Sequence, residues 1–248
     1  MGWTARRRSK HCGATSLPES SSWLGSGPRR WPPEVPTPAE PPTQLRGFPT
    51  TRLPLGQVLY RIVRRRDADG RVRTPWFFAS SGRPDSGRFD LPVPDGTCSL
   101  SDRAYGAWLE VFGQTRIVAR ADAASRALFT VTRVGTRLTL ADFGHERAAT
   151  YGVTLDLSAG DDRPTSQRWA RAIRAHGLAG IVAWIRHDPT ATARNVALFG
   201  PSGARSIVRG WRSRTTDVLA ATELRGQLAR FGIAVLDVPY DVAIAPLP

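Results

Sequence analysis

The sequence contains almost no lysine. Lys10 is the only one among 35 lysine and arginine residues, so arginine sets the basic character of the chain. Aspartate and glutamate number 21, which leaves a formal net charge of +14 at pH 7. Such an excess favours an anionic partner, which could be nucleic acid, an acidic protein or a phosphorylated small molecule.

Cysteine is also scarce, since Cys12 and Cys98 are the only two, and the four histidines are scattered. These numbers exclude a disulfide framework and a four-ligand zinc site, and we expect no metal. No apolar stretch approaches the roughly 18 residues that a membrane span needs, and the N-terminus lacks the apolar core of a secretory signal. We therefore expect a soluble cytoplasmic protein that does not contact a membrane.

Several catalytic motifs are missing as well. The chain has no Walker phosphate loop, no GxGxxG fingerprint, no GxSxG elbow and no HExxH helix. The longest basic run after the first 50 residues is Arg64-Arg65-Arg66, without interleaved aromatic residues. A solvated face is the simpler interpretation of such a run. Direct binding of nucleic acid is therefore the least favoured function, because the basic residues are dispersed.

The first 50 residues differ in composition from the rest. They hold nine of the 20 prolines, a Ser-Ser-Ser run, and seven basic against three acidic side chains. A segment with so little apolar pattern cannot bury enough surface to offset the entropy of ordering. We predict a disordered extension over residues 1–50 and a folded domain over residues 51–248.

From Gly56 onward the apolar pattern becomes regular. It predicts helices over 103–113, 165–176 and 216–231, and strands over 57–63, 75–78, 116–119, 128–131, 137–140, 151–157, 180–185, 195–199 and 233–238. Strands outnumber helices and do not alternate strictly with them. This arrangement favours an α+β fold with a compact mixed sheet core and flanking helices.

The stretch from Ser86 to Phe112 could deliver two charged residues to one cleft. Arg88 precedes a turn rich in Pro, Asp and Gly, a short strand around Ser99 follows, and Glu110 ends a predicted helix. An arginine and a glutamate from different elements suit an anionic substrate with a cationic leaving group. Spacing alone does not identify a site, because solvated positions are typical of such residues.

A series of short motifs follows in order over residues 52–200. They are Leu59-Tyr-Arg-Ile62, Trp76-Phe-Phe78, Gly87-Arg-Phe-Asp90, Gly96-Thr-Cys-Ser-Leu100, Ala107-Trp-Leu-Glu-Val-Phe112, Thr165-Ser-Gln-Arg-Trp-Ala170, Gly180-Ile181, Arg186-His-Asp-Pro189 and Val196-Ala-Leu-Phe199. Their order and spacing are more specific than any single motif. Together they resemble the RES domain family, which is named for an arginine, a glutamate and a serine.

The resemblance implies a fold similar to ADP-ribosyltransferases and a toxin of a toxin–antitoxin pair. Characterised members degrade NAD by phosphorolysis or hydrolysis of the nicotinamide–ribose bond, and an antitoxin with an Xre-type DNA-binding domain inhibits them. NAD would be the substrate, with no prosthetic group, and oligomers would form through the antitoxin complex. Arg88 and Glu110 match the family's catalytic arginine and glutamate. Arg61 matches a further arginine, expected to bind NAD together with Arg88. ADP-ribosyl transfer stays open as a third reaction.

Two positions expected to bind NAD depart from the family. Ser99 stands where the family commonly has a tyrosine, and Ile185 stands where it usually has its serine. Each change removes a hydroxyl-bearing group suited to the ligand, and a lost hydrogen bond of this kind costs about 1–3 kcal/mol. The alternative to an NAD-cleaving enzyme is therefore a catalytically impaired RES-like domain that acts as a binding or interaction module.

Overall fold

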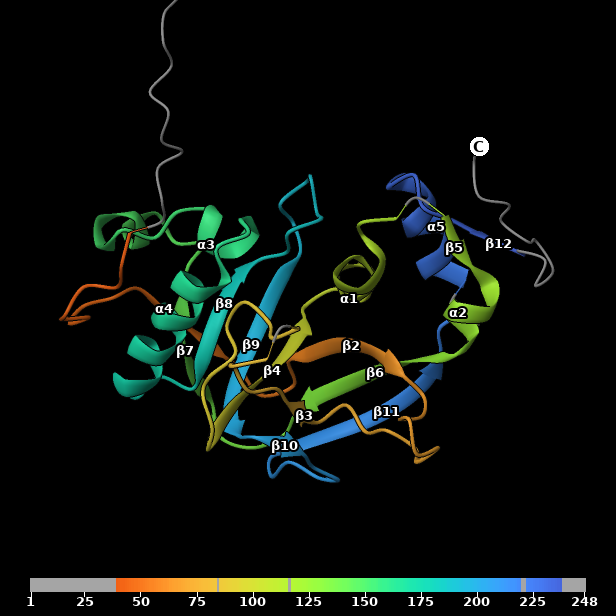
Figure 1. Cartoon of the computed structure of the whole chain (residues 1–248), viewed down its shortest axis with the longest axis horizontal. Helices are drawn as coiled ribbons and strands as arrows, with labels where there is room; N and C mark the ends of the chain where they lie inside the picture. Colours follow the sequence, from red (N-terminus) through yellow and green to blue (C-terminus); the bar gives the residue numbers. More distant parts are fainter. Residues whose placement is uncertain (1–38, 84, 116, 220–221, 238–248) are drawn as a thin grey trace, which may run out of the picture. The chain divides into compact units, whose positions relative to one another are not determined.

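The computed structural model describes residues 39–83, 85–115, 117–219 and 222–237. An eight-stranded sheet occupies the centre of this part of the chain, in the order β1-β7-β8-β9-β4-β2-β6-β11 (Figure 1). β7 and β8 pair in parallel, whereas the other neighbours are antiparallel. The strands are β1 (Thr50–Leu53), β2 (Val58–Arg64), β4 (Asp95–Ser101), β6 (Arg126–Arg133), β7 (Leu138–Asp142), β8 (Gly180–Trp184), β9 (Arg194–Pro201) and β11 (Trp211–Asp217).

Two small sheets and a few helices complete the described part. β3 (Phe77–Phe78) pairs with β10 (Gly203–Ala204), and β5 (Ile117–Ala119) pairs in parallel with β12 (Ala234–Leu236). The helices are α1 (Ala104–Phe112), α2 (Arg120–Ala124), the 3-10 helix η1 (Glu146–Tyr151), α3 (Asp156–Ala159), α4 (Arg163–Ala175) and α5 (Thr222–Arg230). The predicted α+β fold with a mixed sheet core and flanking helices is confirmed. Among the described residues, no helix is both long and apolar enough to cross a membrane.

The helices cover one face of the sheet in two separate groups (Figure 1). α4 packs on β8, and its fully buried Trp169 and Ile173 join Ile181 of that strand in one apolar cluster. α1 packs on β2, where Trp108 and Ile62 belong to a second cluster that also includes residues of α5. In both helices the apolar residues recur every three or four positions, so they lie on one side of the helix, and this side faces the sheet.

Between the two helical groups, the middle of the sheet carries polar side chains. Ser99 of β4 and Asn195 of β9 point to the same face as the helices, because the register pairs Ser101 with Asn195 and Ser99 with Ala197. β2 and β4 share only the pair formed by Tyr60 and Ser101 and then separate. The fold therefore leaves an opening in the middle of the sheet, next to polar groups.

Three segments differ from the sequence-based expectation. Residues 1–38 of the predicted disordered extension lie outside the described residues, but residues 39–50 are packed, with Leu45 and Phe48 each 5% exposed. The strand predicted over 151–157 is wrong, since η1 and α3 occupy most of it. The helix predicted from residue 216 begins only at Thr222, because the edge strand β11 extends to Asp217.

Candidate active site

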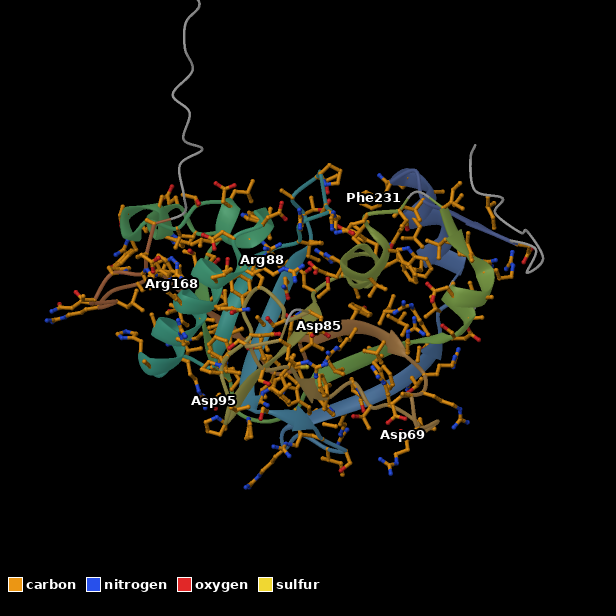
Figure 2. All side chains as sticks on the ribbon, viewed as in Figure 1. Asp69, Asp85, Arg88, Asp95, Arg168 and Phe231 are labelled. Atoms are coloured by element: carbon orange, nitrogen blue, oxygen red, sulfur yellow. The ribbon has the colours of Figure 1, made fainter. Side chains whose placement is uncertain are left out.

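A loop that is hydrogen-bonded to α4 carries Arg88. Gln167 Nε2 donates to Gly87 O at 2.8 Å, and Arg163 Nη1 donates to Ser86 O at 3.1 Å. The neighbouring Phe89 is 3% exposed and anchors the loop in the α4 cluster. The guanidinium of Arg88 donates a hydrogen bond of 2.5 Å to Gly160 O, just after the end of α3. These contacts hold a half-buried arginine at the edge of the α3–α4 group (Figure 2).

Glu110 enters the same space from the opposite side. It lies near the end of α1, where Ala107 to Leu109 are buried and Glu110 itself is exposed. The surrounding protein partly desolvates the carboxylate and thereby raises the pKa of Glu110, while the charges of Arg88 and Arg186 lower it. Glu110 is thus open to solvent and substrate, yet more basic than an ordinary glutamate.

Two adjoining cavities form the cleft between these residues. A polar cavity of about 230 Å³ is lined by Arg88, Arg163 and Arg186 among others. An apolar cavity of about 160 Å³ lies beneath α1. Its apolar lining consists of Tyr60, Ile62, Leu100, Ala107 and Val111. Both cavities share Ser99, Glu110 and Asn195. Glu110 therefore lies at the junction of a cationic compartment and an apolar one.

The polar cavity is lined by three arginines and two acidic residues, Glu110 and Asp85, so its lining carries a net positive charge. Burial lowers the pKa of Arg88, and the charge of Arg186 lowers it further, whereas Glu110 opposes the change. Arg186 Nη2 forms an ion pair of 2.8 Å with the exposed Asp161. Guanidinium groups bind phosphate oxygens through paired, charge-assisted hydrogen bonds. The cavity is therefore suited to a diphosphate.

Arg61 lies below the apolar cavity, which it also lines. Its Nη1 donates to Pro75 O at 2.6 Å and to Phe77 O at 3.2 Å, and it contacts Cys98 Sγ at 2.7 Å. The guanidinium therefore bridges the gap between β2 and β4 and fixes the segment that leads into β3. Binding of NAD by Arg61 stays a prediction.

The two positions that depart from the family lie in different surroundings. Ser99 is exposed on the floor of the cleft and lines both cavities. Ile185 is 3% exposed and packs under α1, where a Cβ at Gly106 would overlap its Cδ1 atom. Neither cavity has Ile185 in its lining. A substitution at Ser99 therefore changes the cleft directly, whereas one at Ile185 acts through α1.

Sequence reasoning did not select four residues that line the cleft: Arg163, Arg186, His187 and Asn195. Arg186 and His187 lie just beyond the end of the buried strand β8, after Ile185, and this position near a strand end was the available signal. Burial and the charges of Arg186 and Arg88 lower the pKa of His187, which favours its neutral form. Asn195 Oδ1 is buried without a hydrogen-bond partner among the described residues, and no local pattern predicts its role.

Within the described ranges, no group of acidic, His and Cys side chains could hold a metal ion.

The family model of the RES domain matches residues 58–220. A search of curated proteins found no match. Among solved structures, the M. tuberculosis MbcT–MbcA toxin–antitoxin complex contains a similar chain. The identity is 19% and the TM-score is 0.46, covering 71% of this chain and 92% of that chain.

Proposed function

The chain belongs to the RES domain family, and from this premise we propose that it is the toxin of a toxin–antitoxin pair and cleaves the nicotinamide–ribose bond of NAD. The observation that carries the proposal is the position of Glu110, at the junction of an arginine-lined cavity and an apolar one. NAD has a matching order of groups, because a ribose links its flat nicotinamide ring to its diphosphate.

Each compartment has a role in this reaction. Arg88, Arg163 and Arg186 bind the diphosphate, and the apolar cavity beneath α1 receives the nicotinamide ring. The bond between ribose C1′ and the ring nitrogen breaks, and its electron pair leaves with neutral nicotinamide. Positive charge then develops on the ribose, and the carboxylate of Glu110 stabilises it. In hydrolysis, a water oxygen bonds to C1′ and the water releases a proton; in phosphorolysis, an anionic phosphate oxygen bonds to C1′ instead.

Release of nicotinamide from NAD tests the proposal directly. Purified full-length protein is incubated with NAD, with and without phosphate, and nicotinamide and the ribosyl product are separated by chromatography. We expect the Glu110→Gln variant to lose at least about a hundredfold in rate, because the amide keeps the shape but not the charge that the transition state requires. Equal rates for both proteins would refute the catalytic role of Glu110. The dependence on phosphate separates phosphorolysis from hydrolysis.

A binding module without catalysis is the second candidate. The observation that favours it is Ser99, whose small side chain leaves the cleft floor without the aromatic ring that the family commonly has there. This candidate predicts that NAD raises the melting temperature of the protein while no nicotinamide is released. The Ser99→Tyr variant then distinguishes an impaired enzyme from an unrelated binding site, since only the former gains activity when the ring is restored.

An antitoxin that inhibits the enzyme belongs to the same proposal. The excess of arginine on the chain favours an acidic partner. An Xre-type partner would be encoded beside this chain, and its co-expression should relieve the growth arrest that the chain causes alone. Growth arrest that persists with an inactive Glu110→Gln chain would separate toxicity from NAD cleavage.

A further inference from the structure

A groove of about 620 Å³ lies outside the cleft, along the segment before β3 and the segment after β10. Its apolar lining includes Val72, Trp76 and Phe77. Trp76 is 2% exposed and packs with Trp211 at 5.5 Å between ring centroids, whereas Phe77 and Val72 are 45% and 73% exposed. Exposed apolar groups of this size, gathered in one hollow, are typical of interaction sites.

The same groove carries an excess of positive charge. Five arginines line it against two aspartates. One aspartate, Asp67, accepts hydrogen bonds from the backbone N–H groups of Asp69 and Arg71 and thereby shapes its own turn. The other, Asp85, pairs with Arg83 at 3.2 Å. The guanidinium of Arg205 donates to the carbonyl of Ser202. Asp69, beside the groove, pairs with Arg71 at 3.6 Å, so the positive charge that these carboxylates do not pair with is on Arg61, Arg73 and Arg205.

We propose that this groove binds an acidic segment of a partner protein, with carboxylates on the arginines and an apolar side chain over Val72 and Phe77. A polypeptide can present both kinds of group within a few residues. A single-stranded nucleic acid can place phosphates on the arginines and stack a base on Phe77, but it carries no aliphatic side chain to pack on Val72, the most exposed large apolar residue of the groove. The mixture of exposed aliphatic, aromatic and charged groups thus favours a protein segment over a nucleic acid.

The groove adjoins the cleft at two residues. Arg61 lines both the groove and the apolar cavity, and Asp85 lines both the groove and the polar cavity. In Figure 2, Asp85 lies between Arg88 of the cleft and Asp69 of the turn beside the groove. A partner segment in the groove would therefore contact the loop that carries Arg88. The identification of that partner as the antitoxin rests on the proposed function; the binding itself does not.

The test measures binding of a short fluorescein-labelled peptide of glutamates with two leucines, by fluorescence anisotropy. The full chain carries Glu110→Gln throughout, so that NAD cleavage cannot influence the result. The groove variant combines Arg73→Glu and Arg205→Glu. The control variant combines Arg212→Glu and Arg214→Glu on β11, which makes the same change of charge. These two residues point to the opposite face from Trp211, which contacts Trp76 in the groove.

We expect the groove variant to bind the peptide at least about tenfold more weakly, because close charge pairs are lost and repulsive ones replace them. The control variant should retain the affinity of the parent to within about threefold, since distant exposed charges are screened by salt. A leucine-free peptide should bind more weakly to the parent. The proposal is overturned if no peptide binds, if both variants lose affinity equally, or if a thymidine oligonucleotide of equal charge binds more tightly. Circular dichroism confirms that each variant is folded.

Discussion

The cleft has two walls, which are held in place by different means. The arginine wall consists of α3, α4 and the loop that carries Arg88, and the glutamate wall consists of α1, which carries Glu110. On the arginine side, Asp162 caps α4 by accepting a hydrogen bond from Thr165 N at 3.0 Å, and Ser166 Oγ donates to Leu157 O at the same distance. Phe48, Phe143 and Trp169 form a ring cluster with centroids 5.6–6.1 Å apart. Hydrogen bonds and aromatic contacts thus fix the wall that presents the arginines.

The glutamate side has fewer such contacts. α1 begins at Ala104 without a hydrogen bond from a capping side chain. Its position depends on close approach, since a Cβ at Gly106 would overlap Ser101 Oγ, and one at Gly113 would overlap His187. The arginine wall is thus held by hydrogen bonds and aromatic contacts between several segments, whereas α1 is held by the ring contact of Tyr105 with Phe231 and by close packing at its glycines. The predictions below test each wall in turn.

The largest loss of stability is expected from Trp169→Ala in the arginine wall. Trp169 is fully buried, and its Nε1 donates to Ala39 O at 2.8 Å. Loss of the ring should lower the free energy of unfolding by about 3–5 kcal/mol, measured by urea denaturation. Trp169→Phe keeps an aromatic ring and should lose clearly less. A loss below about 1 kcal/mol for the alanine variant would mean that the aromatic contacts do not hold this wall.

The second-largest loss of stability is expected from Ile185→Ser, which changes the packing beneath the glutamate wall. This change removes packing under Gly106 and buries a hydroxyl, so we expect a loss of about 2–4 kcal/mol in unfolding free energy. Ile185→Val is the matched control, with an expected loss of about 0.5–1.5 kcal/mol. Because Ile185 lines neither cavity, the serine should not raise NAD cleavage, whereas Ser99→Tyr should. A rise in activity from Ile185→Ser alone would show that this position reaches the substrate.

The residues found from the sequence and those missed differ in the range of their contacts. Arg88 and Glu110 belong to one stretch of 27 residues, and both line the polar cavity. Arg163 reaches the same loop from 77 residues away, through its hydrogen bond to Ser86 O. Asn195 is at the cleft because β9 pairs with β4. Such contacts depend on the folded topology, and neither residue lies in a pattern that predicts it.

The same reason explains the elements that the sequence did not predict. β2, β4, β8 and β9 bury apolar residues in patterns typical of strands. β11 is an edge strand whose residues are mostly exposed, so its Trp-Arg-Ser-Arg-Thr-Thr-Asp sequence has no hydrophobic period. Residues 39–50 likewise have little pattern of their own, and they are ordered by partners such as Trp169 and Tyr151.

A smaller effect is expected when the arginine wall loses charge but keeps its packing. Arg163 is exposed and lines the polar cavity. Arg163→Ala should raise the KM for NAD about tenfold with a smaller change in kcat, because a diphosphate contact present before the reaction is lost together with the hydrogen bond to Ser86 O that supports the Arg88 loop. The KM of the parent should also rise with salt. Arg171→Ala, on the same helix but outside both cavities, is the control. An equal rise in both variants would attribute the effect to overall charge.

The smallest effect concerns the carboxylate of Glu110 and its dependence on pH. Because the folded protein raises the pKa of Glu110, its ionised form is less favourable in the folded chain than in the unfolded one. This group therefore stabilises the fold at pH values below the pKa of an unfolded glutamate, and that contribution is lost as pH rises through the raised pKa. Glu110→Gln removes the charge, so the variant should melt at a higher temperature than the parent at pH 7.

The difference in melting temperature should shrink toward acid pH, where the parent carboxyl is protonated as well. NAD cleavage by the parent should fall with decreasing pH at a midpoint above the ordinary glutamate value of 4.5, because the reaction requires the carboxylate. Melting curves and initial rates between pH 4 and 8 provide both measurements. A variant that melts below the parent at every pH would mean that Arg88 and Arg186 stabilise the charge of Glu110 by more than desolvation opposes it. In that case the glutamate wall would be held electrostatically by the arginine wall, and the difference between the two would be smaller than their packing indicates.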